Sequence, residues 1–253
     1  MRVFASRGRA SRTAARLAAV LFLVVGWCGA SAETVDYPLL PALQSERAID
    51  GLLLEVASNG DRLVVVGDQG HVLWSDDDGQ SWSQADVPTS LTLTSVAFAG
   101  DGSLWATAHD GFLLTSVDGG ATWSVKLSGS DVASLSVGAI EAQVEALQAR
   151  LDAATEDTRE DIEWALDEAQ FALDEAMLAV DEGMTTPLLK VWFDGDLGYA
   201  LGAYNVFLHT SDGGATWGAH SNRLANPDKY HLYSIVRSTA GTLLVAGEAG
   251  TLL

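Results

Sequence analysis

The chain has 253 residues, with 14 Lys and Arg against 34 Asp and Glu, which gives a formal net charge of −20. Hydrophobic residues make up 48% of the chain and charged residues 19%, a composition typical of globular proteins and not of disordered ones. Because an acidic surface repels phosphate groups, the charge argues against nucleic acids and anionic lipid surfaces as partners.

Residues 1–32 have the pattern of a cleavable signal peptide. They carry five arginines and no acid, an apolar run at 17–25 and an Ala-Ser-Ala sequence at 30–32, which is the small-x-small form that signal peptidase recognises. The apolar run is only about half of the ~20 residues that a transmembrane helix needs. We therefore expect cleavage after Ala32 and a periplasmic or secreted product that starts at Glu33.

Cleavage would leave a strongly acidic chain without cysteine. The basic residues fall to 14 − 5 = 9, and the balance becomes 9 − 34 = −25. Cys28, the single cysteine, lies within the signal peptide, and the large Trp27 before it argues against a lipoprotein site. The product would form no disulfide and would offer no thiolate to a metal.

One eight-residue pattern, [ST]-x-D-x-G-x-[ST]-W, occurs at residues 75–82, 116–123 and 210–217. The hydroxyl side chain and the Asp can accept backbone N–H hydrogen bonds, and the Gly permits a positive φ angle. We therefore predict a structural turn, after which the Trp re-enters a strand and packs on a neighbouring sheet. The predicted structural residues are Ser75, Asp77, Gly79, Trp82, Ser116, Asp118, Gly120, Trp123, Thr210, Asp212, Gly214 and Trp217.

The same order of apolar runs and turns precedes each copy, and a fourth set begins at Thr242. Gly70, Gly111, Asn205 and Gly250 occupy equivalent turn positions, at spacings of 41, 94 and 45 residues. A period of about 40 residues with four short strands is typical of a β-propeller blade. The sequence therefore predicts an all-β propeller of four-stranded blades, with the first strands near 52–57, 63–67, 72–75 and 82–84.

The fourth set stops where its own turn motif should begin. A ring of roughly six to eight blades would then be incomplete and would leave an unpaired strand edge. We expect the parent reading frame to continue with an [ST]-x-D-x-G motif soon after Leu253 and to add at least two blades.

Residues 137–184 change to a period of about 3.5, which predicts an inserted antiparallel α-helical hairpin with a coiled-coil seam. Its two arms meet at 155–158, where Thr158 and Asp161 resemble a helix N-cap and an acidic first turn. The hairpin carries fourteen acids, with Arg150 and Arg159 as its bases. The expected seam residues are Ile140, Val144, Leu147, Leu151 and Ala154, and Ile162, Leu166, Ala169, Leu173, Ala176 and Val180.

Trp164, Phe171 and Leu178 form a second apolar stripe, at a spacing of seven and off the seam. A stripe of this kind needs its own cover. Two alternatives are open: the stripe packs on the propeller of the same chain, or it docks a partner protein.

Strand order places the hairpin on the propeller face that also carries the turns between second and third strands. This is the usual binding face of propellers, although turns also contain Asp, Asn and Gly for backbone reasons. The candidate partner-binding residues are therefore His71, His109, Asp110, Tyr204, Asn205, Tyr230 and His231 on the propeller, and Trp164, Phe171 and Leu178 on the hairpin.

The repeated motif is identified as the Asp-box, or bacterial neuraminidase repeat, and the chain resembles Asp-box propellers from about residue 52 to 253. Residues 62–73 and 188–217 are most similar to the photosystem II stability/assembly factor family, which includes secreted members outside photosynthesis. The resemblance implies non-catalytic boxes and a chaperone that holds a membrane-protein precursor during assembly. Photosynthetic members are associated with a basic docking patch, whereas this chain would keep nine Lys and Arg.

Motifs for catalysis are sparse. The five histidines include no His-Glu-x-x-His pair, and the chain has no G-x-S-x-G elbow or Walker-type phosphate loop. A sialidase-like or other glycoside hydrolase is the alternative function, because Asp-boxes are named for the sialidase group and the chain is rich in carboxylates. The sialidase subclass would also need an arginine cluster, and no Arg-Ile-Pro signature occurs near the start.

The sequence therefore predicts an exported, non-catalytic scaffold that binds a protein partner in the cell envelope, without cofactor or metal. A passive structural module and a metal-stabilised propeller remain as competing hypotheses. The expected domain order is a signal peptide at 1–32, a lead-in at 33–51, two blades at 52–136, the hairpin at 137–184, and a third blade with a partial fourth at 185–253.

Overall fold

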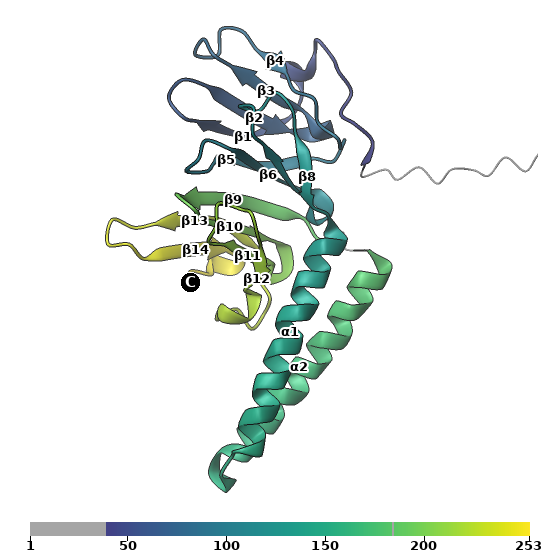
Figure 1. Ribbon diagram of the computed structural model, residues 1–253, viewed down its shortest axis with the longest axis vertical. Helices are drawn as coiled ribbons and strands as arrows, with labels where there is room; N and C mark the ends of the chain where they lie inside the picture. Colours follow the sequence, from purple (N-terminus) through teal and green to yellow (C-terminus); the bar gives the residue numbers. More distant parts are fainter. Residues whose placement is uncertain (1–38, 184) are drawn as a thin grey trace, which may run out of the picture. The chain divides into compact units, whose positions relative to one another are not determined.

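The computed structural model describes residues 39–183 and 185–253. The expected signal peptide, its cleavage site after Ala32 and the last hairpin residue, Met184, lie outside these residues. The described chain consists of three four-stranded antiparallel sheets, one two-stranded sheet and two long helices (Figure 1).

Each four-stranded sheet keeps its strands in sequence order and forms one propeller blade. The strands are β1 (Leu53–Ser58), β2 (Leu63–Gly67), β3 (Val72–Ser75) and β4 (Ser83–Gln84) in blade 1; β5 (Leu93–Phe98), β6 (Leu104–Ala108), β7 (Leu113–Ser116) and β8 (Ser124–Leu127) in blade 2; and β9 (Leu188–Asp194), β10 (Leu197–Gly202), β11 (Phe207–Thr210) and β12 (Gly218–Ala219) in blade 3. The strands predicted for the first blade are confirmed to within one residue.

Blade 4 contains β13 (Leu232–Arg237) and β14 (Leu243–Gly247), and Ala246 forms a further bridge with Leu252. Within the described residues the blades do not close into a ring. The lead-in segment lies on blade 1, where the side chain of Gln44 donates a hydrogen bond to the carbonyl of Ala85 at 2.9 Å.

A short 3₁₀ turn joins the second and third strands of every blade. Its last residue is Gly70, Gly111, Asn205 or Gly250, with φ angles of 72°, 73°, 64° and 79°. Gly adopts this left-handed region freely, and Asn tolerates it better than most other residues. The predicted register of the repeats is therefore correct, and the backbone explains why Asn205 can stand where the other blades have Gly.

The eight-residue motif forms the turn between the third and fourth strands. In blade 1 the Gly79 N–H donates to Ser75 Oγ at 2.9 Å, and Ser81 donates to Asp77 through its N–H at 2.8 Å and its hydroxyl at 2.6 Å. The motifs of blades 2 and 3 repeat all three hydrogen bonds. The turn is therefore closed by its own side chains.

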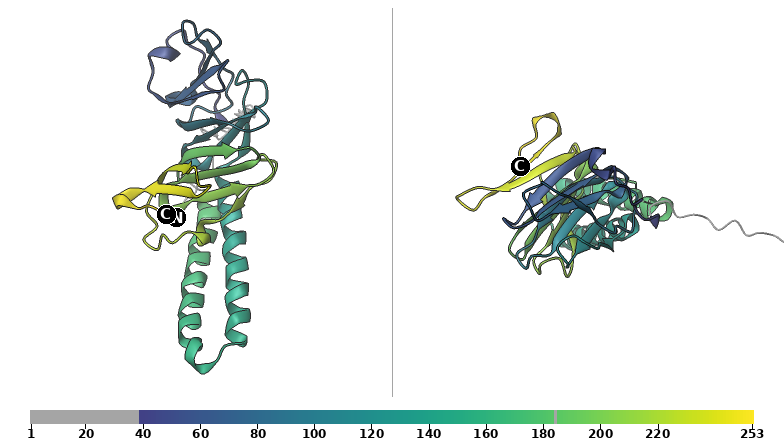
Figure 2. Two further views of the ribbon diagram at one scale, coloured as in Figure 1. Left: turned by 90° about the vertical axis from the view of Figure 1, so that its left-hand side faces the viewer. Right: turned by 90° about the horizontal axis from the view of Figure 1, so that it is seen from above.

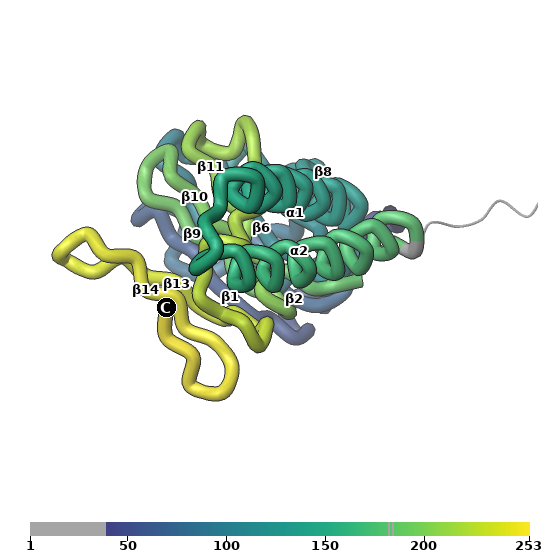
Figure 3. The backbone as a smooth tube through the Cα atoms, turned by 90° about the horizontal axis from the view of Figure 1, so that it is seen from below, coloured from purple at the N-terminus to yellow at the C-terminus, as the bar shows by residue number. Residues whose placement is uncertain are grey.

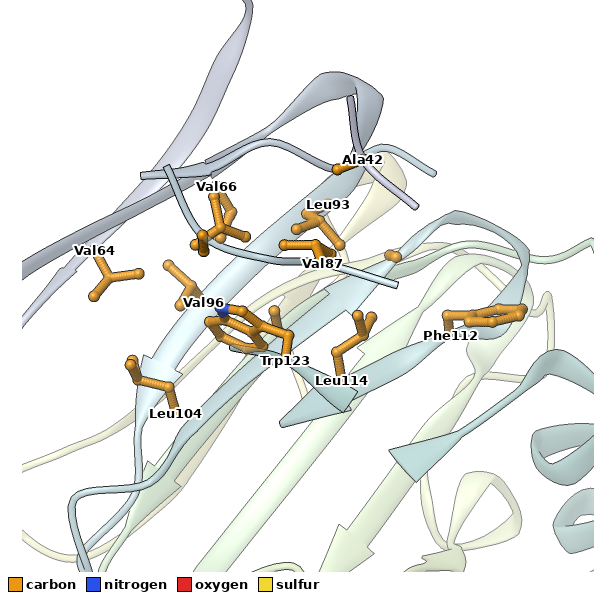
Figure 4. Packing of buried hydrophobic residues seen from close by; sticks show 14 residues of the cluster. Ala42, Val64, Val66, Val87, Leu93, Val96, Leu104, Phe112, Leu114 and Trp123 are labelled. Carbon is orange, nitrogen blue, oxygen red and sulfur yellow. The ribbon is translucent and has the colours of Figure 1, made fainter. Parts of the chain in front are cut away.

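The Trp at the end of the second and third motifs packs against the preceding blade. Trp123 of blade 2 shares a buried core with Val64 and Val66 of blade 1 (Figure 4). Trp217 of blade 3 lies against Trp105 of blade 2, with 5.6 Å between ring centroids. Large aromatic side chains therefore fill the space between sheets, as expected from the motif.

Two helices, α1 (Gly129–Asp152) and α2 (Glu156–Glu182), connect β8 to β9 as an antiparallel hairpin (Figure 1 and Figure 2). The predicted start at Val137 is wrong, because Ser128 and Asp131 form a capping box that begins the helix at Gly129. The N-cap of α2 is likewise Thr155 and not Thr158, which puts two acids in the first turn, at the positive end of the helix dipole.

The hairpin has two kinds of apolar contact. Toward its tip, Leu147 of α1 packs with Leu166 and Ala169 of α2 in the predicted seam. Toward its base, Val132 is fully buried in the core between blades 2 and 3. The first turns of α1, which lie outside the predicted insertion, therefore anchor the hairpin to the propeller.

Candidate partner-binding groove

A groove runs between the hairpin and the loops of blade 3. It consists of two hollows of about 700 Å³ and 310 Å³. Both are lined by Ile140 and Ala172 of the hairpin and by Asn205, Ser221 and Lys229 of the propeller. Because five residues line both hollows, we treat them as one hairpin–propeller groove. Figure 3 shows the backbones of α1 and α2 side by side.

The hairpin wall of the groove carries the predicted apolar stripe. Trp164 and Phe171 line the larger hollow, and each side chain is 65% exposed. Leu178 continues the stripe beyond the hollow and is 59% exposed. Within the described residues the propeller leaves more than half of each of these three side chains exposed, which favours the alternative in which the stripe docks a partner protein.

The stripe belongs to a seven-residue repeat in α2. Residues 164–170, 171–177 and 178–184 read WALDEAQ, FALDEAM and LAVDEGM, so that an Asp-Glu pair follows each stripe residue at positions three and four. Residues three and four apart are neighbours on a helix surface. Sequence reasoning found the spacing of seven but missed these acids, which the repeat itself could have revealed.

The propeller wall is formed by a loop that Asn226 holds in shape. Asn226 is 5% exposed, and its amide donates hydrogen bonds to Asn205 Oδ1 and to the carbonyl of Tyr230, both at 2.9 Å. The N–H of Tyr230 donates back to Asn226 Oδ1 at 3.1 Å. These bonds fix the loop that presents Lys229, which has a positive φ of 51°.

Lys229 joins the two walls. Its ammonium lies 3.1 Å from Glu175 Oε2, and both side chains are more than half exposed. Among the described residues this is the one ion pair between the hairpin and the propeller. Sequence reasoning did not single out Lys229, although a base in so acidic a chain was a usable signal.

Four of the predicted propeller residues come together beside this groove, and two of them, Tyr204 and Asn205, line it. Tyr204 N–H donates to His231 Nδ1 at 2.9 Å, and the two rings meet edge to face with centroids 4.6 Å apart. Asn205 and Tyr230 both bond to Asn226. Tyr204 is 65% exposed and lines the smaller hollow, so it is available to a bound partner.

The other three predicted residues do not line the groove. His71 is 6% exposed, and its Nδ1 lies 3.9 Å from Asp68 Oδ1, where both atoms lack a hydrogen-bond partner in the structure. His109 and Asp110 lie in the turn of blade 2, which contacts α1. Equivalent turn positions therefore have different surroundings, because the groove forms beside blade 3.

A pair of stacked histidines lies between blades 3 and 4. His209 and His220 have ring centroids 4.6 Å apart and an angle of 16° between rings. Burial lowers the pKa of both imidazoles.

In the described ranges no set of three His, Cys, Asp or Glu side chains is arranged to hold a metal ion. None of the described helices has the length and apolar character needed to cross a membrane.

A known protein family matches the first two blades and most of the hairpin. The family model of the DUF6242 beta propeller domain matches residues 44–178, which is more than half of the chain. The chain belongs to this family. The DUF6242 match ends at the last stripe residue, so the hairpin wall of the larger hollow lies inside the match and the blade 3 loops lie outside it.

One solved structure with a TM-score above 0.5 shares the propeller fold. A structure described as YCF48 bound to D1 peptide matches with a TM-score of 0.51 and 15% identity, over 80% of this chain and 49% of that chain. YCF48 from Cyanidioschyzon merolae matches with a TM-score of 0.46 and 16% identity, over 80% and 50%. This DUF6242 chain therefore spans about half the length of these proteins. No curated protein matches it.

Proposed function

We propose that the chain is an exported, non-catalytic propeller scaffold that binds a protein partner in the cell envelope and assists its assembly. One observation carries this proposal: two aromatic side chains, Trp164 and Phe171, stand 65% exposed beside a groove of about 700 Å³. Aromatic residues are enriched in protein–protein interfaces, and they often dominate the binding energy there.

One structural neighbour supports a peptide-binding role for the present propeller. It is the structure described as YCF48 bound to D1 peptide. At 15% identity the likeness concerns the fold, so the partner of the present chain follows from its own groove. That groove is apolar and acidic, which favours a protein partner over an anionic ligand.

The three repeated turns act structurally in this proposal, as Asp-boxes. In each turn hydroxyl and backbone N–H donors surround the Asp carboxylate, and they lower the pKa of Asp77, Asp118 and Asp212 to about 2. A carboxyl group whose pKa lies so far below neutral pH is ionised there, so it is a poor general acid. Because the proposed scaffold is non-catalytic, assays of the chain against a panel of glycosides should show no turnover.

Export rests on the sequence of residues 1–32. The chain isolated from its native cells should start at Glu33, which mass spectrometry of the intact protein measures directly. A protein that still carries residues 1–32 would contradict the export proposal. It would not bear on the proposal that the groove binds a partner.

Affinity capture from a native envelope extract tests partner binding. The wild-type chain should retain a stoichiometric protein, and the double variant Trp164→Ala/Phe171→Ala should lose it, because truncation removes the exposed aromatic surface. Met177→Ala provides the matched control, since Met177 is a 51% exposed apolar residue of the same helix that lines neither hollow.

Circular dichroism should show the same helix content for all variants, because the changed side chains are exposed. If folded wild-type protein retains no partner, the scaffold function is wrong. If turnover of a glycoside appears and depends on a carboxylate of the binding face, the hydrolase alternative replaces it.

A further inference from the structure

We propose that the open seam of α2 docks a basic amphipathic helix of the partner protein. This inference rests on the proposed function, because it names the chemistry of the partner that the scaffold binds. The open seam consists of Trp164, Phe171 and Leu178 together with the acidic residues Asp167, Glu168, Asp174 and Glu175.

The spacing of the seam fits another helix. Stripe residues recur every seven positions, which corresponds to about 10.5 Å along the axis, and Trp164 lies about 21 Å from Leu178. Apolar positions of a second helix recur with the same repeat when two helices pack in a coiled coil. An extended peptide repeats its side chains about every 7 Å on one face and would lose register with the stripe.

Small side chains beside the stripe give a second helix room to approach. Ala165 and Ala172 line the larger hollow and Ala179 lines the smaller one, again at a spacing of seven. Aromatic knobs next to alanine positions provide the knobs and holes that helix packing needs. On its other side α2 already packs on α1 through Leu166 and Ala169. The helix therefore has two apolar seams, one covered and one open.

The charge around the seam selects a basic partner. Asp167, Glu168, Asp174 and Glu175 are exposed and lie three or four residues from a stripe residue. Only Glu175 has a basic partner in the described structure, which is Lys229. Lys and Arg beside the apolar positions of an incoming helix would pair with the remaining acids, which steers and orients its binding.

The same charges argue against a second copy of this chain as the occupant. Two copies of the seam would place Asp-Glu pairs against each other, and like charges across an interface are unfavourable. The hairpin region 137–184 has fourteen acids and two bases, so no other part of it supplies the missing positive charge. The occupant is therefore a basic helix from another protein.

A synthetic peptide provides the probe. It has three heptads with leucine at two core positions and lysine beside them, and its binding to the full chain is measured by fluorescence anisotropy. We expect saturable binding that weakens as salt is added, because salt screens the ion pairs. A peptide with the same composition in scrambled order, and one with glutamate in place of lysine, should bind at least tenfold more weakly.

Charge reversal locates the binding. Asp167→Lys/Asp174→Lys should weaken binding of the lysine peptide at least tenfold. Glu141→Lys/Glu145→Lys makes the same charge change on exposed residues of α1 that line neither hollow, and it should alter the affinity less than twofold. Trp164→Ala should weaken binding and Met177→Ala should not.

Three outcomes would overturn the inference: no binding of the lysine peptide, equal binding of the scrambled peptide, or equal loss with both charge-reversal pairs. The last would mean that the acidic hairpin attracts cations without a docking site. The proposed function fails separately, when the envelope extract yields no partner. A partner retained by Asp167→Lys/Asp174→Lys keeps the scaffold function and removes the docking site.

Discussion

At the scale of single residues, hydrogen-bond saturation explains why the repeated motif keeps its pattern. Asp77 Oδ1 accepts from the Ser75 hydroxyl at 2.7 Å and from Ser81 N–H, while Oδ2 accepts from the Ser81 hydroxyl. The motif alone predicts this turn, because the hydroxyl residue and the Asp accept hydrogen bonds from backbone N–H groups and the Gly permits a positive φ angle. The motif could not predict the role of Asn226, because its hydrogen bonds to Asn205 and Tyr230 form only in the folded chain.

The turn carboxylates should make stability depend on pH in the acid range. The pKa of each Asp falls from its ordinary 3.8 to about 2, chiefly because a hydroxyl of Ser81, Thr122 or Thr216 hydrogen-bonds to it. A folded-state pKa below the unfolded one adds stability that is complete above about pH 4 and is lost as pH falls through about 2. Urea unfolding across this range measures it.

Asp118→Asn should lower the free energy of unfolding at neutral pH and flatten its dependence between pH 4 and 2. Glu141→Gln, on an exposed helix position, is the control and should leave both unchanged. If Asp118→Asn keeps the wild-type pH dependence, the turn carboxylate contributes nothing to it.

Asn226→Ala should destabilise the protein by about 1–3 kcal/mol, because it leaves buried polar partners without their hydrogen bonds. Asn222→Ala, an exposed residue of the same loop, should change stability by less than ~0.5 kcal/mol. Chemical unfolding of both variants measures the difference. Equal stability of the two variants would mean that the Asn226 bonds do not hold the loop.

At the scale of elements, the repeats predict the strands and the period predicts the helices, but neither predicts the helix ends. Heptad spacing identifies the seam from Ile140 onward, whereas α1 begins at Gly129 because Ser128 caps it and Val132 enters the propeller core. That contact depends on where blades 2 and 3 meet. The groove could not be predicted for the same reason, since one wall belongs to the hairpin and the other to a loop whose Lys229 lies 54 residues after Glu175.

Ser128→Ala should remove the capping box and cost about 1 kcal/mol of stability. The Ser128 side chain accepts from Asp131 N–H, and Asp131 accepts from Ser128 N–H at 2.8 Å. Ser134→Ala is the matched control, because that hydroxyl bonds to a carbonyl inside the helix. Thermal unfolding measures the stability of both variants. If Ser134→Ala is less stable than Ser128→Ala, the assigned helix start is contradicted.

At the scale of the whole described chain, blades are held together by large aromatic side chains and by a hydrogen bond from a side chain of one blade to the backbone of its neighbour. Trp105 packs on Trp217 and Phe193 of blade 3, with centroids 5.6 Å away from each. At the junction of blades 1 and 2 the guanidinium of Arg62 donates to the carbonyl of Gly119 at 2.9 Å. The period of about 40 residues predicts neighbouring blades, and the Trp of each motif predicts the contact.

Gly214→Ala should disrupt the junction of blades 2 and 3. A Cβ at Gly214 would overlap the Trp105 ring, and its φ is 91°. Gly102→Ala shares the positive φ, at 84°, but meets nothing within 4 Å. We expect Gly214→Ala to cost about 1–3 kcal/mol more in unfolding free energy than Gly102→Ala, as overpacking does. Equal costs would mean that the junction can shift to make room.

Photo-crosslinking in native cells tests the central claim, that the hairpin–propeller groove binds a protein partner. A photoreactive phenylalanine analogue replaces Phe171, and in a matched chain it replaces Met177, the exposed residue outside the groove. Ultraviolet light should join the chain with position 171 modified to one discrete protein, and the chain with position 177 modified to none. No adduct at 171, or equal adducts at both positions, would contradict the account.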